Sequence, residues 1–162
     1  MIEAVRRLEP AGVCAVEGVM NGTANFILSK LGEGVAFEHA LAEAQRLGFA
    51  EADPSADVDG HDAADKLSIL IREAFGAAMP PERIAKMSLS EITPDMCAAA
   101  AEKGQVYKQI ARAQRLDGGA IDAQVSIEPV ALAHPFAGAR NEQNRALVTD
   151  GAGRVYAVYG KG

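Results

Sequence analysis

The sequence has few of the residues that would point to nucleic-acid or membrane binding. It contains no tryptophan, and only 5% of its 162 residues are aromatic, so few rings are available to stack on bases. Its formal net charge of -6 disfavours phosphate backbones and anionic membranes as partners. No apolar run approaches the roughly 20 residues of a membrane-spanning helix. These absences predict a protein that binds neither nucleic acid nor membrane.

Cysteine is also scarce, which argues against a disulfide framework. Cys14 and Cys97 are far apart and lack any metal-binding spacing, so we interpret both as free thiols in a reducing compartment. The first ten residues lack the apolar segment of a signal peptide. We therefore expect a cytoplasmic protein. Its length and 49% hydrophobic content predict a single domain over residues 1–162 with a substantial core.

Residues 1–104 have mainly helical periodicity. A short helix is predicted over 2–9, and the β-branched run at 12–20 predicts a buried strand. A helix capped by Asn21 or Thr23 should follow. A further helix over 36–48 would place apolar residues on one face, namely Phe37, Leu41, Ala44 and Leu47.

The strongest helical pattern starts near Gly60. Its apolar positions recur at helical spacing and form one stripe, made of Ala63, Leu67, Leu70, Ile71 and Ala74. Gly76 and the prolines at 80 and 81 should end this helix. Another helix is predicted over 93–104, with Thr93 as its cap and Pro94 in its first turn.

The last third of the chain changes to strand periodicity. Strands are predicted over 105–115, 120–132, 144–150 and 154–160, with hairpin turns at "LDGG" and "DGAG". This order predicts an α+β fold: a mixed, largely antiparallel sheet of about five strands with helices packed on one face. Because "VYAVY" and "ALV" show little polar alternation, we expect the other face to meet a second copy in a homodimer.

Several common binding motifs are absent or incomplete. The stretch after Ser55 has part of a calcium-loop spacing, but Ser55 and Lys66 stand where the loop needs carboxylates. "GAGRVY" at 151–156 lacks the third glycine of a dinucleotide fingerprint and precedes a strand. The three histidines are scattered along the sequence, so we expect each to be a surface or core residue rather than a metal ligand.

The stretch "EADPSADVDGHDAADK" at 51–66 holds six carboxylates and a terminal lysine. Asp62 and Lys66 are four residues apart at the edge of the apolar stripe, which suits either proton transfer or an ordinary helix ion pair. The "NGT" turn at 21–23 could bind a substrate carboxylate through free amides, or it could be only a cap. Glu51 could bind an ammonium, or be solvated. Together these groups would recognise a zwitterion.

Two blocks of sequence resemble one enzyme family. "EGVMNGTANFIL" and "ALAEAQRLGFAEADPSADVDGHDAADKLSIL" are similar to the substrate and dimerisation region of homoserine dehydrogenases. The resemblance implies an NAD(P)-dependent interconversion of L-homoserine and L-aspartate 4-semialdehyde, a step in threonine and methionine biosynthesis. It further implies that Lys66 transfers the proton at the substrate hydroxyl and that Asp62 positions Lys66.

The same resemblance assigns residues to substrate binding. It implies that Glu51 holds the substrate amine, that Asp57 is a further carboxylate of the site, and that Gly22 and Thr23 line the pocket. Phe49 stands where many members have tyrosine, so one hydroxyl contact would be missing. His61 occupies a position that is usually aliphatic.

The resemblance covers the substrate domain without the Rossmann domain that family members carry. We therefore expect this chain to be inactive alone and to need a separate Rossmann domain for its NAD(P) cofactor. The alternative is a non-catalytic module that binds an amino acid or dimerises and has kept only the pocket.

Overall fold

The computed structural model describes residues 5–6, 12–140 and 143–161. The helix expected over 2–9 lies largely outside these residues. The elements, in chain order, are β1 Val13–Val19, α2 Gly22–Gly32, α3 Phe37–Arg46, α4 Ser55–Val58, α5 His61–Phe75, β2 Ala85–Lys86, α6 Pro94–Ala101, β3 Gln105–Arg115, β4 Ile121–Ala131, β5 Gln143–Asp150 and β6 Val155–Lys161. Short 3-10 turns at Pro81–Arg83 and Leu89–Glu91 flank β2. None of the described helices is both long and apolar enough to span a membrane.

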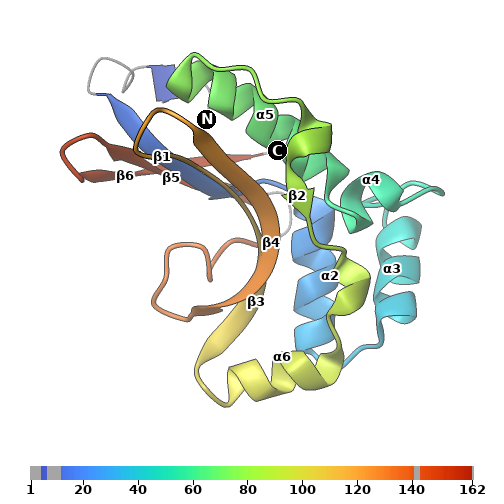
Figure 1. Ribbon diagram of the computed structural model, residues 1–162. Helices are drawn as coiled ribbons and strands as arrows, with labels where there is room; N and C mark the ends of the chain where they lie inside the picture. The colour runs from blue at the N-terminus through green and yellow to red at the C-terminus, as the bar shows by residue number, and fades with distance from the viewer. Residues whose placement is uncertain (1–4, 7–11, 141–142, 162) are drawn as a thin grey trace.

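A single sheet with helices on one face forms the fold, as the sequence predicts (Figure 1). The strand order is β2-β4-β3-β1-β5-β6, and every pair is antiparallel except β2 with β4. The sheet has six strands because the two-residue β2, absent from the expected set, joins its edge. The first long strand, β1, lies between β3 and β5, so the C-terminal strands do not form a simple meander.

The amphipathic helix α5 packs against the middle of the sheet. Its predicted stripe is buried, with Leu67 and Ile71 fully inaccessible, and it meets Val16 of β1 and Ala113 of β3. Gly76 ends α5 in the left-handed conformation, with φ at 64°. Burial of this stripe fixes the angle at which the first turn of α5 reaches the end of β1.

A second cluster joins α2, α3 and α6 beside the sheet. Ile27 and Leu31 of α2 and Ala40 and Ala44 of α3 are fully buried in it. Leu47, which the sequence pattern placed on this face, is 46% exposed instead. The helix α3 ends at Arg46, so Leu47 lies in the turn beyond it and escapes the contact.

The sheet face away from the helices is not uniformly apolar, contrary to expectation. At its centre, Arg112 forms ion pairs with Glu17 at 2.9 Å and Glu128 at 3.0 Å. Elsewhere the connection at 132–140 folds back over the sheet, and its Phe136 and Ala139 are fully buried (Figure 1). Part of the apolar surface assigned to a second copy is thus covered by the chain itself.

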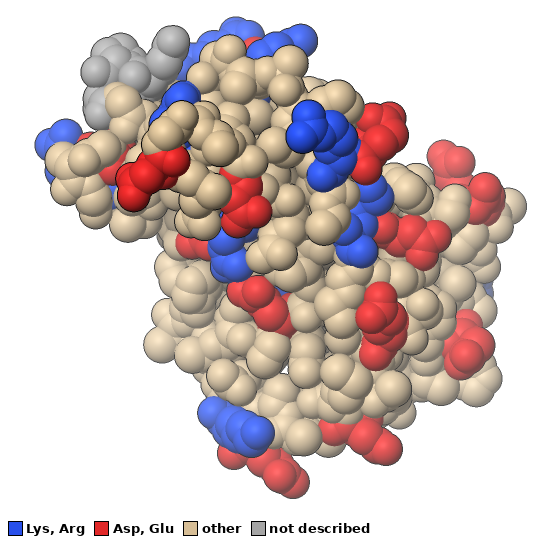
Figure 2. Space-filling model, viewed as in Figure 1, with Lys and Arg blue, Asp and Glu red and all other residues tan. Residues whose placement is uncertain are grey.

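Acidic and basic side chains are mixed over the surface shown in Figure 2, with wide uncharged areas between them. No broad basic patch is visible on that face. The mixture agrees with the modest negative net charge of -6.

Candidate active site

The end of β1 and the start of α2 form one wall of the candidate site. Asn21 is the N-cap of α2, with extended backbone angles, and its Oδ1 accepts a hydrogen bond from the Ala24 amide at 2.8 Å. This is the ordinary use of asparagine at a helix start, since it satisfies one free amide. Asn21 is 3% exposed, so the NH2 group of its side chain also points into the protein.

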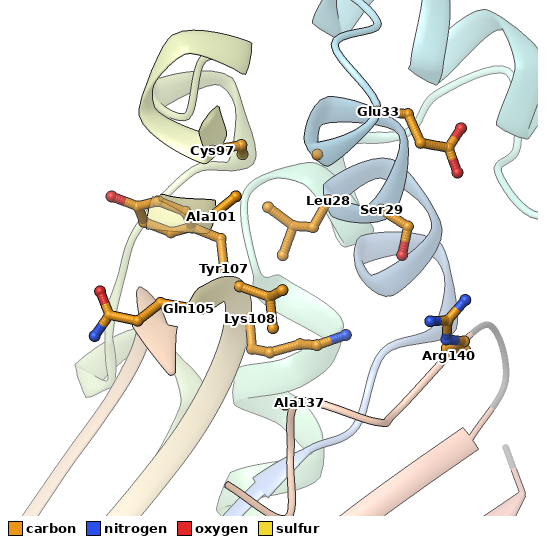
Figure 3. Close-up of a pocket in the computed structure, with 12 residues that line it drawn as sticks. Leu28, Ser29, Glu33, Cys97, Ala101, Gln105, Tyr107, Lys108, Ala137 and Arg140 are labelled. Carbon is orange, nitrogen blue, oxygen red and sulfur yellow. The ribbon is translucent and has the colours of Figure 1, made fainter. Parts of the chain in front are cut away.

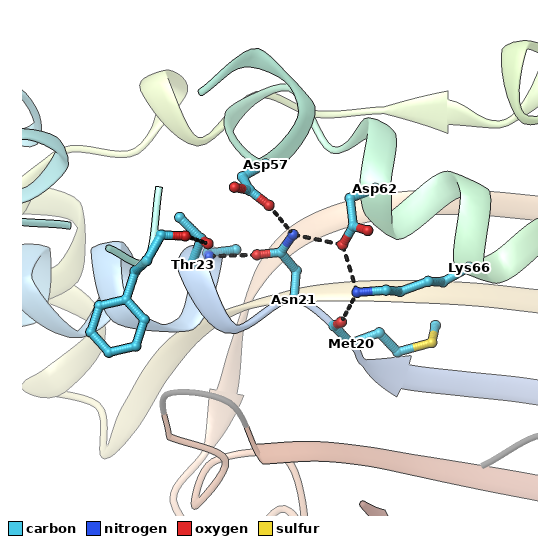
Figure 4. Close-up of polar contacts among 8 residues, drawn as sticks. Met20, Asn21, Thr23, Asp57, Asp62 and Lys66 are labelled. Atoms are coloured by element: carbon cyan, nitrogen blue, oxygen red, sulfur yellow. Dashed lines mark hydrogen bonds and ion pairs between the residues drawn. The ribbon is translucent and has the colours of Figure 1, made fainter. Parts of the chain in front are cut away.

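Two carboxylates meet the amide group of Asn21 (Figure 4). Its Nδ2 donates to Asp57 Oδ1 at 2.6 Å and to Asp62 Oδ2 at 2.8 Å. Asp57 lies on the short helix α4, which the sequence analysis did not predict, and Asp62 lies in the first turn of α5. Gly60 joins the two helices at a φ of 75°, a left-handed conformation that glycine adopts without strain.

Lys66 completes this polar network. Its Nζ donates to Asp62 Oδ2 at 2.7 Å and to the Met20 carbonyl at 3.0 Å (Figure 4). An ammonium has three N–H groups, so one donor remains after these two bonds. Because the side chain is 42% exposed, that donor can reach a bound molecule. The helix ion pair expected as the plainer alternative is present, but it is tied to the strand end as well.

These groups line an open hollow of about 320 Å³. Six of the seven predicted site residues contribute to its wall: Gly22, Thr23, Phe49, Asp57, Asp62 and Lys66. Thr23 Oγ1 donates to the Phe49 carbonyl at 2.7 Å, and the Phe49 ring stacks on Phe26 with centroids 4.9 Å apart. The α2 start and the loop after α3 are therefore held together.

Glu51 is the predicted site residue that the structure leaves outside this wall. It is exposed, and the contact that locates it is a hydrogen bond from Gln45 Nε2 to its backbone carbonyl at 3.0 Å. The carboxylates of the acidic stretch at 51–66 therefore have two kinds of surroundings. Glu51 and Asp53 face solvent, whereas Asp57 and Asp62 join the network around Lys66.

Sequence reasoning missed two asparagines of the site. The side chain of Asn21 was considered only as a cap, although an asparagine ahead of a pair of carboxylates could have suggested a bridging amide. Asn144 comes from β5, and strand register brings it beside Met20, since Val19 pairs with Arg145. Its Oδ1 is buried and receives no hydrogen bond from the described residues. No local signal could have found it, because the contact spans most of the chain.

The described residues contain neither a cluster of metal-ligating side chains nor a glycine-rich dinucleotide turn. Among them, no group of three or more His, Cys, Asp or Glu side chains is arranged to hold a metal ion. The described strand that leads directly into an α-helix is β1, and its turn carries one glycine, Gly22, where a dinucleotide fingerprint needs three. The arrangement suits proton transfer to a small polar molecule.

Comparison with known proteins decides the family. The family model described as homoserine dehydrogenase matches residues 2–162. The chain belongs to the homoserine dehydrogenase family. A homoserine dehydrogenase of Synechocystis is 41% identical over 153 residues, which are 91% of this chain and 35% of that protein. A protein of Pseudomonas canavaninivorans named NAD(+)-dependent homoserine dehydrogenase is 33% identical and is matched over 98% of this chain and 45% of its own length.

Solved structures of homoserine dehydrogenases share the fold. That of Thiobacillus denitrificans superposes with a TM-score of 0.92 at 38% identity, over 99% of this chain and 38% of that one. The chain spans about a third of the length of the first curated homoserine dehydrogenases that it matches.

Proposed function

We propose that this chain is the substrate-binding and proton-transfer domain of an NAD(P)-dependent homoserine dehydrogenase that interconverts L-homoserine and L-aspartate 4-semialdehyde. The observation that carries the proposal is the placement of Lys66, which is held by Asp62 and the Met20 carbonyl at the edge of a hollow. Membership of the family supports the same reaction.

The proposed proton chemistry is confined to Lys66 and its two partners. In the oxidative direction, neutral Lys66 Nζ accepts the proton of the homoserine hydroxyl and becomes an ammonium, which Asp62 and the Met20 carbonyl stabilise. In the reductive direction, the ammonium returns that proton to the oxygen of the semialdehyde. The nicotinamide supplies the hydride acceptor or donor, and we assign its binding to a domain outside the described residues.

Recognition of the substrate's carboxylate and ammonium groups would use the start of α2 and the loop after α3. The Ala24 amide is already bonded to Asn21, which leaves the amides of Gly22 and Thr23 at the start of α2 for a substrate carboxylate. Glu51 would hold the ammonium, as the family resemblance implies, by turning its exposed side chain toward the hollow. The Asn144 oxygen would accept a hydrogen bond from a substrate donor.

Calorimetry with matched ligands tests substrate binding. L-Homoserine and L-2-aminobutyrate differ by one hydroxyl, the group that Lys66 would contact. We expect L-homoserine to bind at least tenfold more tightly, and Lys66→Met to abolish that preference. Lys30→Met is the control, because Lys30 pairs with Glu33 and Glu43 away from the hollow. Equal binding of both ligands to the unmodified chain would refute the proposal.

Turnover separates the enzyme from a binding module. A dinucleotide-binding domain from a relative would be added, with L-homoserine and NADP⁺ or NAD⁺, and formation of reduced nicotinamide followed by absorbance. We expect activity only in the mixture, with kcat reduced about 100-fold or more in Lys66→Met. Binding without turnover in this mixture would support the amino-acid-binding module instead.

A further inference from the structure

A second cavity, of about 260 Å³, lies at the opposite end of α2 from the candidate active site (Figure 3). Three elements form it: the last turns of α2, the helix α6, and the start of β3. The connection at 132–140 closes its remaining side. Much of its wall is apolar, contributed by Leu28, Cys97, Ala101, Val106 and Ala137.

Lys108 enters this cavity from β3 (Figure 3). The residue is only 4% exposed, and its Nζ donates to the Ala139 carbonyl at 2.6 Å. No carboxylate of the described residues lies within ion-pair distance of this ammonium. Burying a charge without a counter-ion is costly, so this arrangement calls for a compensating group.

The surrounding charges increase that cost. Arg140 also lines the cavity, and Arg145 lies near enough to repel Lys108 as well. Arg145 donates to the carbonyls of Pro135 and Gly138, which do not neutralise it. Glu33, the carboxylate in the cavity wall, is 62% exposed and pairs with Lys30 at 3.4 Å.

Arg112 offers an internal comparison on the same strand and the same face of the sheet. Its guanidinium is compensated by two carboxylates, Glu17 and Glu128. Glu128 is also the cross-strand neighbour of Lys108, but its carboxylate is engaged by Arg112 and Ser126. The fold therefore pairs Arg112, whose side chain is 33% exposed, with two carboxylates, and leaves the more deeply buried Lys108 with a carbonyl alone.

We propose that the cavity around Lys108 and Arg140 is a binding site for a small organic carboxylate. The two cations would share the carboxylate, which removes the uncompensated charge, and the apolar wall would cover a short carbon chain. An inorganic anion could meet the charges but would leave the apolar wall uncovered. This inference is independent of the function proposed for the Lys66 site.

Thermal unfolding with matched salts tests this site. Butyrate, acetate and inorganic phosphate would each replace chloride at constant ionic strength and pH 7. We expect butyrate to raise the melting temperature by several degrees and to exceed acetate. Phosphate stabilises folded proteins nonspecifically, so its effect should be similar in the unmodified chain and in Lys108→Met. Lys108→Met and Arg140→Gln should lose the butyrate effect, whereas Lys103→Met, in the exposed turn after α6, should retain it. An equal response in Lys108→Met, or none in the unmodified chain, would overturn the proposal.

A spectroscopic readout covers the case in which Lys108→Met does not fold. Nitrogen NMR of the lysine side chains in the unmodified protein should show the Lys108 resonance titrating at higher pH when butyrate is present, since a bound anion favours the charged amine. An unchanged Lys108 titration at saturating butyrate contradicts carboxylate binding there.

Discussion

Asn21 is the residue on which most of the proposed active site depends. It caps α2 and donates to both Asp57 and Asp62, so it joins the strand end to two later helices. Asn21→Ala should lower the free energy of unfolding by about 1–2 kcal/mol, through the lost cap and the two carboxylates left without their shared donor. Asn21→Ser keeps a capping oxygen but cannot bridge the carboxylates, and should lose less. Urea denaturation measures both, and an unchanged Asn21→Ala would contradict this role.

Lys108 should give the protein an unusual alkaline stability profile. Burial, together with the charges of Arg140 and Arg145, lowers the pKa of Lys108 to about 8 from its ordinary value of 10.5. Between those values the unfolded chain binds more protons than the folded one, so stability rises with pH as the folded lysine becomes neutral. The gain is at most about 3 kcal/mol.

The comparison with Lys108→Met isolates this contribution. From pH 7 to 10, the free energy of unfolding of the unmodified chain should increase relative to that of Lys108→Met, measured by urea denaturation at each pH. Parallel profiles for the two proteins would show that the lysine is not buried as described.

At the scale of elements, the joint between α4 and α5 sets the distance between the two site carboxylates. Gly60 has a φ of 75°, and a Cβ there would lie 3.4 Å from the Val125 side chain. Gly60→Ala should cost about 1–2 kcal/mol of stability and also weaken L-homoserine binding severalfold. Gly34→Ala is the control, with a φ of 85° and open space around it. It should lose stability without affecting binding; equal binding in both variants would contradict the prediction.

The sequence predicted elements well where their signals are local. The helices α2, α3, α5 and α6 and the strands β1, β3, β4, β5 and β6 were expected within a few residues of their observed bounds, since caps, glycines and periodicity are short-range features. The short α4 and β2 were missed, because neither is long enough to show a period. Family resemblance, not spacing, supplied the roles of Lys66 and Asp62.

What the sequence could not predict depends on contacts between distant segments. The position of β1 between β3 and β5, the covering of the outer face by residues 132–140, and the entry of Asn144 into the site all follow from tertiary packing. The exposure of Glu51 was not predictable from the sequence either, since its predicted role requires a side-chain orientation that the structure does not show.

At the scale of the whole molecule, the homodimer stays a prediction. The exposed apolar side chains on the outer face of the sheet indicate which strand would form its interface. The exposed apolar strip on the outer face lies on β6, where Val155 is 60% and Tyr159 is 67% exposed and Ala157 lies between them. Light scattering at micromolar concentration should give twice the monomer mass. Ala157→Glu should shift it toward the monomer, whereas Ala98→Glu, on exposed α6, should not. A monomeric unmodified chain would refute the prediction.

The central place of β1 also governs when this domain can fold. β1 leaves the ribosome before both of its partners, which are about 100 residues away in β3 and about 130 residues away in β5. Until Gln143–Asp150 has been synthesised, one edge of β1 has nothing to pair with, and a nascent chain would expose it to aggregation. Assembly of the sheet, and with it the placement of Asn144 beside Met20, must therefore wait until Gln143–Asp150 has been synthesised.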